Sequence, residues 1–177
     1  MSQSRPLVDE SGNIILIGMP GVGKSTLGVL LAKALGYDFV DTDLLIQRRA
    51  GETLATYMQS QGYQALRQLE ARVILDLSCK ATVVATGGSA VYSANAMAHL
   101  ASLGVVVYLR CPVETLAPRI ASMADRGVAA PAGQTLEEVA EERVPLYEGY
   151  ADITLDIRDM DSTQALTALL RRLSSNA

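Results

Sequence analysis

The clearest chemical signal in the sequence is a glycine-rich segment that ends in lysine and serine. Residues 18–25 read GMPGVGKS and match the pattern G-x-x-x-x-G-K-[ST]. The segment follows the apolar run IILI and precedes the stretch TLGVLLAKAL, so it is expected to join a strand to a helix. Glycines let backbone N–H groups turn inward, and a helix N-terminus adds partial positive charge. The segment therefore predicts a phosphate-binding loop; the alternative is a glycine-rich turn that matches by chance.

The nucleotide is expected to contact six residues of this segment. They are Gly21, Val22, Gly23, Lys24, Ser25 and Thr26. Lys24 would neutralise the β- and γ-phosphates and take part in catalysis, while Ser25 would bind Mg²⁺. Thr26 would add a second hydroxyl near the phosphates. The predicted ligands are thus ATP and Mg²⁺.

Two aspartates follow the second apolar run, in the segment FVDTD. Carboxyl ends of parallel strands are where open α/β sheets bind ligands, and alternate residues of an extended segment point the same way. Asp41 and Asp43 are therefore expected to face one cleft. Asp41 would hold a Mg²⁺-bound water, and Asp43 would orient or deprotonate an attacking hydroxyl. The alternative is that one aspartate only caps the helix that begins LLIQRR.

Two classes of nucleotide-binding protein are disfavoured by motifs that the sequence lacks. The NKxD motif of GTPases is missing, because the asparagines are Asn13, Asn95 and Asn176 alone. The run TVVAT ends in Gly87-Gly88 rather than in the aspartate of a Walker B strand. The remaining class is a kinase for a small molecule, in which another carboxylate organises the metal.

The elements that would position these residues alternate between strand and helix. Short runs of branched apolar residues recur between amphipathic stretches, which is typical of α/β proteins with a mostly parallel sheet. These runs are Asn13–Ile17, Asp38–Val40, Thr82–Ala85, Val105–Leu109 and Ile153–Leu155. A last helix is expected after an N-cap at Asp161 or Ser162. The segment 125–134 has little to anchor it and predicts a mobile surface loop.

From Asn13 to Asp156 the sequence resembles the shikimate kinase family, within the nucleoside-monophosphate-kinase group of P-loop folds. The resemblance rests on the loop, the aspartate pair, RQLE at 67–70, Gly87-Gly88, and RVPLY at 143–147. It implies one three-layer α/β domain with a five-stranded parallel sheet of order 2-3-1-4-5 and a mobile lid at about 125–135. The implied reaction transfers the γ-phosphate of ATP to the 3-hydroxyl of shikimate, a step toward chorismate and the aromatic amino acids.

The resemblance also assigns four arginines. Arg67 and Arg143 would bind the acceptor's carboxylate, and Glu70 would fix Arg67 from one helical turn away. Arg126 would be the lid arginine that stabilises the transferring phosphate, and Arg119 would pack against adenine. The alternatives are a surface ion pair for Arg67, a glutamate partner on the same helix for Arg143, and a solvated helix position for Arg119.

Some positions depart from the family pattern, and they leave the acceptor open. Gly87, Gly88 and Ser89 are assigned to the acceptor, but Ser89 stands where relatives carry a third glycine. Gly127, Val128 and Ala129 in the lid, Leu66 and Gln47 also differ from the usual residues. The alternatives are a kinase for a gluconate-like acid or a nucleoside monophosphate, and an ATP-binding protein without turnover.

Composition sets the remaining expectations. The chain has 177 residues, 49% of them apolar, and a net charge of -4, so one domain without a nucleic-acid partner is expected. Apolar runs are too short to span a membrane, so a cytoplasmic protein is predicted. It is also expected to be a monomer. Cys79, Cys111 and His99 are expected to be structural. Disorder is expected at residues 1–10 and 174–177.

Overall fold

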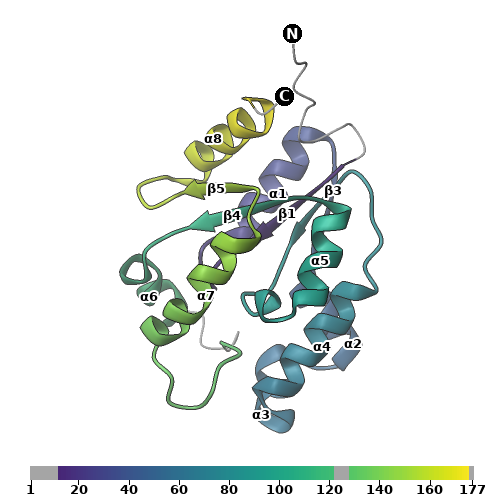
Figure 1. Ribbon diagram of the computed structural model, residues 1–177, viewed down its shortest axis with the longest axis vertical. Helices are drawn as coiled ribbons and strands as arrows, with labels where there is room; N and C mark the ends of the chain where they lie inside the picture. The colour runs from purple at the N-terminus through teal and green to yellow at the C-terminus, as the bar shows by residue number, and fades with distance from the viewer. Residues whose placement is uncertain (1–11, 122–127, 176–177) are drawn as a thin grey trace.

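The computed structural model describes residues 12–121 and 128–175 as an α/β fold with three layers (Figure 1). Five strands form one parallel sheet in the order β2-β3-β1-β4-β5, as the family resemblance implies. The elements along the chain are β1 (Asn13–Ile17), α1 (Lys24–Leu35), β2 (Asp38–Asp41), α2 (Thr42–Ala50), α3 (Leu54–Gln61), α4 (Tyr63–Leu75), β3 (Thr82–Ala85), the 3₁₀ turn η1 (Ala90–Tyr92), α5 (Ala94–Leu103), β4 (Gly104–Arg110), α6 (Val113–Ala121), α7 (Leu136–Tyr150), β5 (Ile153–Asp156) and α8 (Ser162–Ser175).

The main core lies on both faces of the sheet. Every residue of β1 and β3 is buried, as expected for central parallel strands covered on both sides. The helices α1 and α8 contact each other on one face, whereas α5 and α7 cover the other face (Figure 1). Because all five strands are parallel, the loops that follow them gather at one edge of the sheet. The candidate site lies at this edge.

A second, smaller apolar cluster extends the domain beside α2, α3 and α4. Its buried members are Ile46, Leu54, Leu66, Leu69, Val73 and Ala129. Ala129 comes from the predicted lid and is only 7% exposed, so the expectation that this segment has little to anchor it is wrong for its described part. Residues 125–127 lie outside the described residues.

The chain ends only partly follow the sequence-based expectation. Residues 1–10 lie outside the described residues, but Ser174 and Ser175 belong to α8 rather than to a disordered end. The predicted N-cap is confirmed, because the Asp161 carboxylate accepts the Gln164 N–H at 2.8 Å. No helix in the described ranges combines the length and apolar character needed to cross a membrane.

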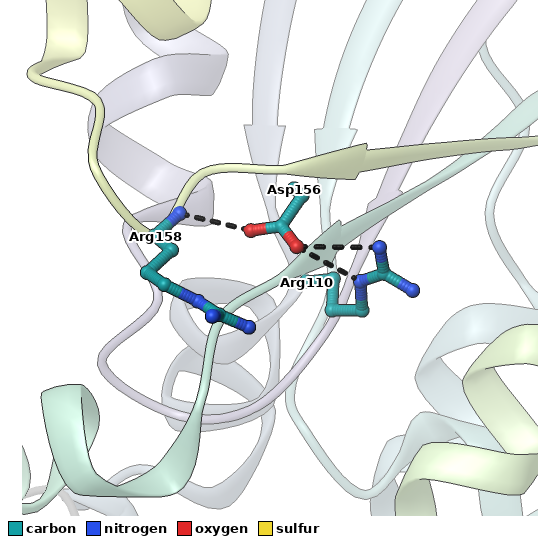
Figure 2. A network of polar contacts seen from close by, with 3 residues as sticks. All are labelled: Arg110, Asp156 and Arg158. Atoms are coloured by element: carbon teal, nitrogen blue, oxygen red, sulfur yellow. Dashed lines mark hydrogen bonds and ion pairs between the residues drawn. The ribbon is translucent and has the colours of Figure 1, made fainter.

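One polar network fastens the end of the edge strand β5. The Asp156 carboxylate accepts from the Arg110 guanidinium at 3.2–3.3 Å, and its other oxygen accepts the Arg158 N–H at 3.1 Å (Figure 2). Arg110 and Asp156 are register partners on β4 and β5. The network therefore holds the last pair of the ladder and the chain that leaves it.

Candidate functional site

The loop after β1 has the conformation that its glycines permit. Gly21 and Gly23 have φ values of +75° and +100°, a region that other L-residues rarely adopt. Gly23 is the N-cap of α1, and it has no side chain that could cover the helix N-terminus. The first N–H groups of α1 therefore face the region where an anion is stabilised by the helix dipole. The expected strand–loop–helix unit is present.

Lys24 is folded back into this loop. Its ammonium group donates to the carbonyl oxygens of Gly18 and Met19 at 2.8 and 2.9 Å, and the residue is 8% exposed. Burial lowers the pKa of Lys24 to about 8, while the charges of Asp43 and Asp41 oppose this shift. A phosphate placed in the loop would stabilise the ammonium form, because it supplies the opposite charge that burial leaves uncompensated.

Asp41 caps α2, as one of the two alternatives predicts, and it also contacts the phosphate-binding loop. One carboxylate oxygen accepts the Asp43 N–H at 2.9 Å and caps α2, while the other accepts the Ser25 hydroxyl at 2.6 Å. The reasoning from an extended segment is wrong, since β2 ends at Asp41 and Asp43 lies in the first turn of α2. The two carboxylates diverge: Asp41 contacts the phosphate-binding loop, and Asp43 faces the cavity.

A cavity of about 390 Å³ lies at the carboxyl edge of the sheet. The predicted site residues that line it are Gly21, Gly23, Lys24, Ser25, Thr26, Asp43, Gly87, Gly88, Ser89 and Arg143. Four further predicted residues, all described, are not in its lining: Val22, Asp41, Arg67 and Arg119. The phosphate-binding loop and the residues assigned to the acceptor, apart from Arg67, thus share one cavity.

The segment after β3 lies so close to two carboxylates that a side chain there would displace them. A Cβ on Gly87 would lie 2.1 Å from Glu70 Oε1 and 2.9 Å from Asp43 Oδ1. A Cβ on Gly88 would lie 2.9 Å from Arg143 Nη1. Any side chain here would displace charged groups of the site, so the two glycines let the backbone serve as the wall of the cavity.

Ser89 changes the role that was expected of Glu70. The Ser89 hydroxyl donates to Glu70 Oε2, and Glu70 is only 2% exposed. Within the described residues Glu70 makes no ion pair with Arg67, so the expected contact between them is wrong. The physical reason is that Ser89, across the cavity wall, offers a short hydrogen bond to the buried carboxylate.

Glu70 is the most perturbed acid of the site. Burial raises the pKa of its carboxyl to about 7, and the charge of Asp43 raises it further, whereas the Ser89 hydrogen bond and the charge of Arg143 lower it. Its Oε1 atom is buried and has no hydrogen-bond partner among the described residues. A carboxyl group in this setting exchanges its proton near neutral pH.

The two arginines assigned to the acceptor converge on one oxygen atom. Arg67 donates from Nε and Nη2 to the Ala129 carbonyl at 3.1 and 2.8 Å, and Arg143 donates from Nη2 to the same oxygen at 3.0 Å. Arg143 is 1% exposed and donates to Ala129 and Tyr92, which argues against the alternative of an exposed arginine paired with a glutamate on the same helix. The donors of two cations therefore surround a single neutral acceptor, a geometry that suits an anion better.

Tyr92 contacts both of these arginines, although no sequence pattern selects it. Its ring lies 3.7 Å from Arg67 Cζ, and its hydroxyl accepts from Arg143 Nε at 3.3 Å. It stands 51 residues from Arg143 in sequence, so no local pattern connects them. The one available signal is its position three residues after Ser89 in the segment that follows the glycines.

Arg119 and Arg126 differ in what the structure shows of them. Arg119 lies on α6 against the phosphate-binding loop. A Cβ added to Gly21 would lie 3.6 Å from the Cβ of Arg119. Arg126 lies outside the described residues.

His99 is expected to be structural, and its Nε2 atom lies 2.8 Å from the Leu77 carbonyl oxygen. Cys111 is buried as expected, whereas Cys79 is only half-buried.

A five-stranded parallel sheet of this order, with a phosphate-binding loop after its central strand, defines the P-loop kinase class of α/β proteins. The family model for shikimate kinase matches residues 20–174. A shikimate kinase from Methylococcus capsulatus is 38% identical over 161 residues, which make up 89% of this chain and 90% of that protein. Shikimate kinase 1 from Yersinia enterocolitica is 37% identical over 171 residues, 94% and 99% of the two chains.

Among solved structures, a shikimate kinase from Acinetobacter baumannii in complex with shikimate superimposes with a TM-score of 0.87. It is 34% identical in sequence, and the match covers 93% of this chain and 94% of that one. The chain belongs to the shikimate kinase family. It is therefore an ATP-dependent kinase.

Proposed function

We propose that this protein transfers the γ-phosphoryl group of ATP to the 3-hydroxyl of shikimate, as a step in the biosynthesis of aromatic amino acids. The observation that carries the proposal is the convergence of Arg67 and Arg143 on one oxygen beside the cavity that Lys24 and Asp43 line. A hydroxy acid matches this layout, because its carboxylate would take the arginine donors while its hydroxyl reaches Asp43.

In the proposed reaction each group has one task. The acceptor hydroxyl attacks the γ-phosphorus, its new O–P bond forms, and its proton passes to Asp43. The bond from the γ-phosphorus to the β–γ bridging oxygen breaks, and ADP leaves with that electron pair. Lys24 and the N–H groups of α1 hold the phosphates, and the position of Arg119 beside the loop supports a contact with the adenine. Arg126 would stabilise the transferring group from the lid.

The residues near the loop fit a magnesium ion. The Ser25 hydroxyl oxygen lies 2.6 Å from one oxygen of the Asp41 carboxylate, so two oxygen ligands are adjacent beside the loop. Within the described residues no group of three acidic, histidine or cysteine side chains could hold a metal alone. That suits Mg²⁺, which is usually bound by one or two protein oxygens together with phosphates and water. When bound, it would neutralise charge on the phosphates.

A coupled ADP-release assay with shikimate, gluconate, AMP and no acceptor tests the proposal. We expect turnover with shikimate alone, loss of turnover in Lys24→Ala and Asp43→Asn, and a raised shikimate KM in Arg67→Ala. Arg72→Ala is the matched control, because Arg72 lies on the same helix but is exposed. ATP binding without shikimate turnover would refute the proposal and favour a changed acceptor or a protein without turnover.

A further inference from the structure

We infer that Tyr92 is a positioning residue that orients Arg67 and Arg143 and thereby sets the affinity for the acceptor's carboxylate. The inference rests on the proposed function, since it assigns those arginines to the acceptor. Tyr92 contacts both of them, once through its ring and once through its hydroxyl. Arg143 Cζ also lies 5.3 Å from the centroid of the Tyr92 ring.

The ring of Tyr92 lies against the guanidinium group of Arg67. Arg67 Cζ lies 3.7 Å from the centroid of this ring and 5.0 Å from the centroid of the Tyr63 ring, and both distances are within the range of cation–π contacts. An arginine side chain loses about 2 kcal/mol of rotamer entropy when it is fixed. A ring that restricts the guanidinium before the ligand arrives removes part of that cost from binding. The closer of the two rings therefore contributes most to preorganisation.

The hydroxyl of Tyr92 separates Arg143 from an acid. It accepts from Arg143 Nε at 3.3 Å and donates to Glu142 Oε2 at 2.8 Å. Gln134 donates to the other oxygen of Glu142 at 2.6 Å. These hydrogen bonds lower the pKa of the Glu142 carboxyl, and the nearby arginines lower it further. Without the hydroxyl, Glu142 would compete with the acceptor's carboxylate for Arg143.

The placement of Tyr92 supports a role in the site rather than in the core. Its N–H donates to the Ser89 carbonyl at 3.1 Å, and its neighbours Ala90 and Val91 are both 2% exposed, so its backbone is fixed. The side chain itself is half-buried and belongs to neither apolar cluster. Shortening it should leave the fold intact.

The test measures shikimate binding by calorimetry and steady-state turnover for Tyr92→Phe and Tyr92→Ala. Tyr92→Phe keeps the ring and loses the hydroxyl, so we expect the shikimate Kd and KM to rise about tenfold. Tyr92→Ala loses both, so the rise should approach a hundredfold. The kcat and the KM for ATP should change less than about twofold. The thermal midpoint should change by no more than a few degrees.

Two further variants separate positioning from a general structural effect. Tyr57 is a half-buried tyrosine that packs against the small apolar cluster. Tyr57→Phe should leave the shikimate KM unchanged. Adding Glu142→Gln to Tyr92→Phe should restore part of the lost affinity, because it removes the competing acid. Shikimate binding equal to wild type in both Tyr92 variants would overturn the inference alone. A wild-type protein that neither binds nor phosphorylates shikimate would overturn the proposed function and, with it, this inference.

Discussion

Replacing Glu70 by glutamine should change how stability depends on pH. The folded protein holds the Glu70 pKa at about 7 by burial, whereas an unfolded glutamate titrates near 4.5. Between these values the folded state binds the proton more tightly, so this group's stabilising contribution is present at low pH and is lost as pH rises toward 7. Between pH 5 and 7.5 the wild-type protein should therefore lose about 2 kcal/mol through this group.

Urea unfolding at several pH values between 5 and 7.5 measures this loss. The range stays below the pKa of Lys24, which burial lowers to about 8, so that the lysine adds little to the slope. Glu70→Gln should abolish the loss, and Glu141→Gln, at an exposed position of α7, should keep it. Ser89→Ala removes the hydrogen bond that lowers the Glu70 pKa, so it should extend the loss to higher pH. Identical pH slopes in wild type and Glu70→Gln would refute the reasoning.

Two other perturbations have expected outcomes in the same unfolding assay. Gly87→Ala places a Cβ against two carboxylates, so it should lower the free energy of unfolding by about 1–3 kcal/mol and raise the shikimate KM. Gly149→Ala has open space around it and should raise the free energy of unfolding by roughly 0.5–1 kcal/mol. Equal effects of the two alanines would contradict the role given to the cavity wall. Asp156→Asn weakens an ion pair whose side chains are 48% and 37% exposed, so it should cost less than about 1 kcal/mol, and less at high salt; a larger, salt-independent loss would argue against this assignment.

The sheet and the phosphate-binding loop could be predicted because their signals are local. The runs Asn13–Ile17 and Thr82–Ala85 coincide with β1 and β3. The strands β2 and β5 extend one residue beyond the predicted C-terminal end, and β4 extends one residue beyond each predicted end. Buried parallel strands consist of continuous apolar residues, so they can be recognised from consecutive positions in the sequence. The loop glycines likewise stand in a row, so their spacing is visible without a structure.

The partners of Glu70 and Arg67 could not be predicted, because they depend on packing between distant segments. The helical spacing from Arg67 to Glu70 favours a contact between them, but Ser89 competes for the carboxylate from the segment after β3. Arg67 instead donates to a backbone carbonyl at Ala129. Every residue carries a backbone carbonyl, so no pattern of side chains predicts that the carbonyl of Ala129 binds Arg67.

The short segment from Gly87 to Tyr92 explains why departures from the family pattern can coexist with an organised site. Its Gly87 N–H donates to Thr42 at 3.1 Å, and its Gly88 carbonyl accepts from Tyr147 at 2.6 Å, so the backbone is tied to α2 and α7. Ser89 withdraws Glu70 from Arg67, which would leave that guanidinium without its expected support. The ring of Tyr92, three residues further on, supplies support from the other direction. Because one segment carries both residues, the serine that engages Glu70 and the tyrosine that contacts Arg67 are placed together, and Arg67 is supported without an ion pair to Glu70.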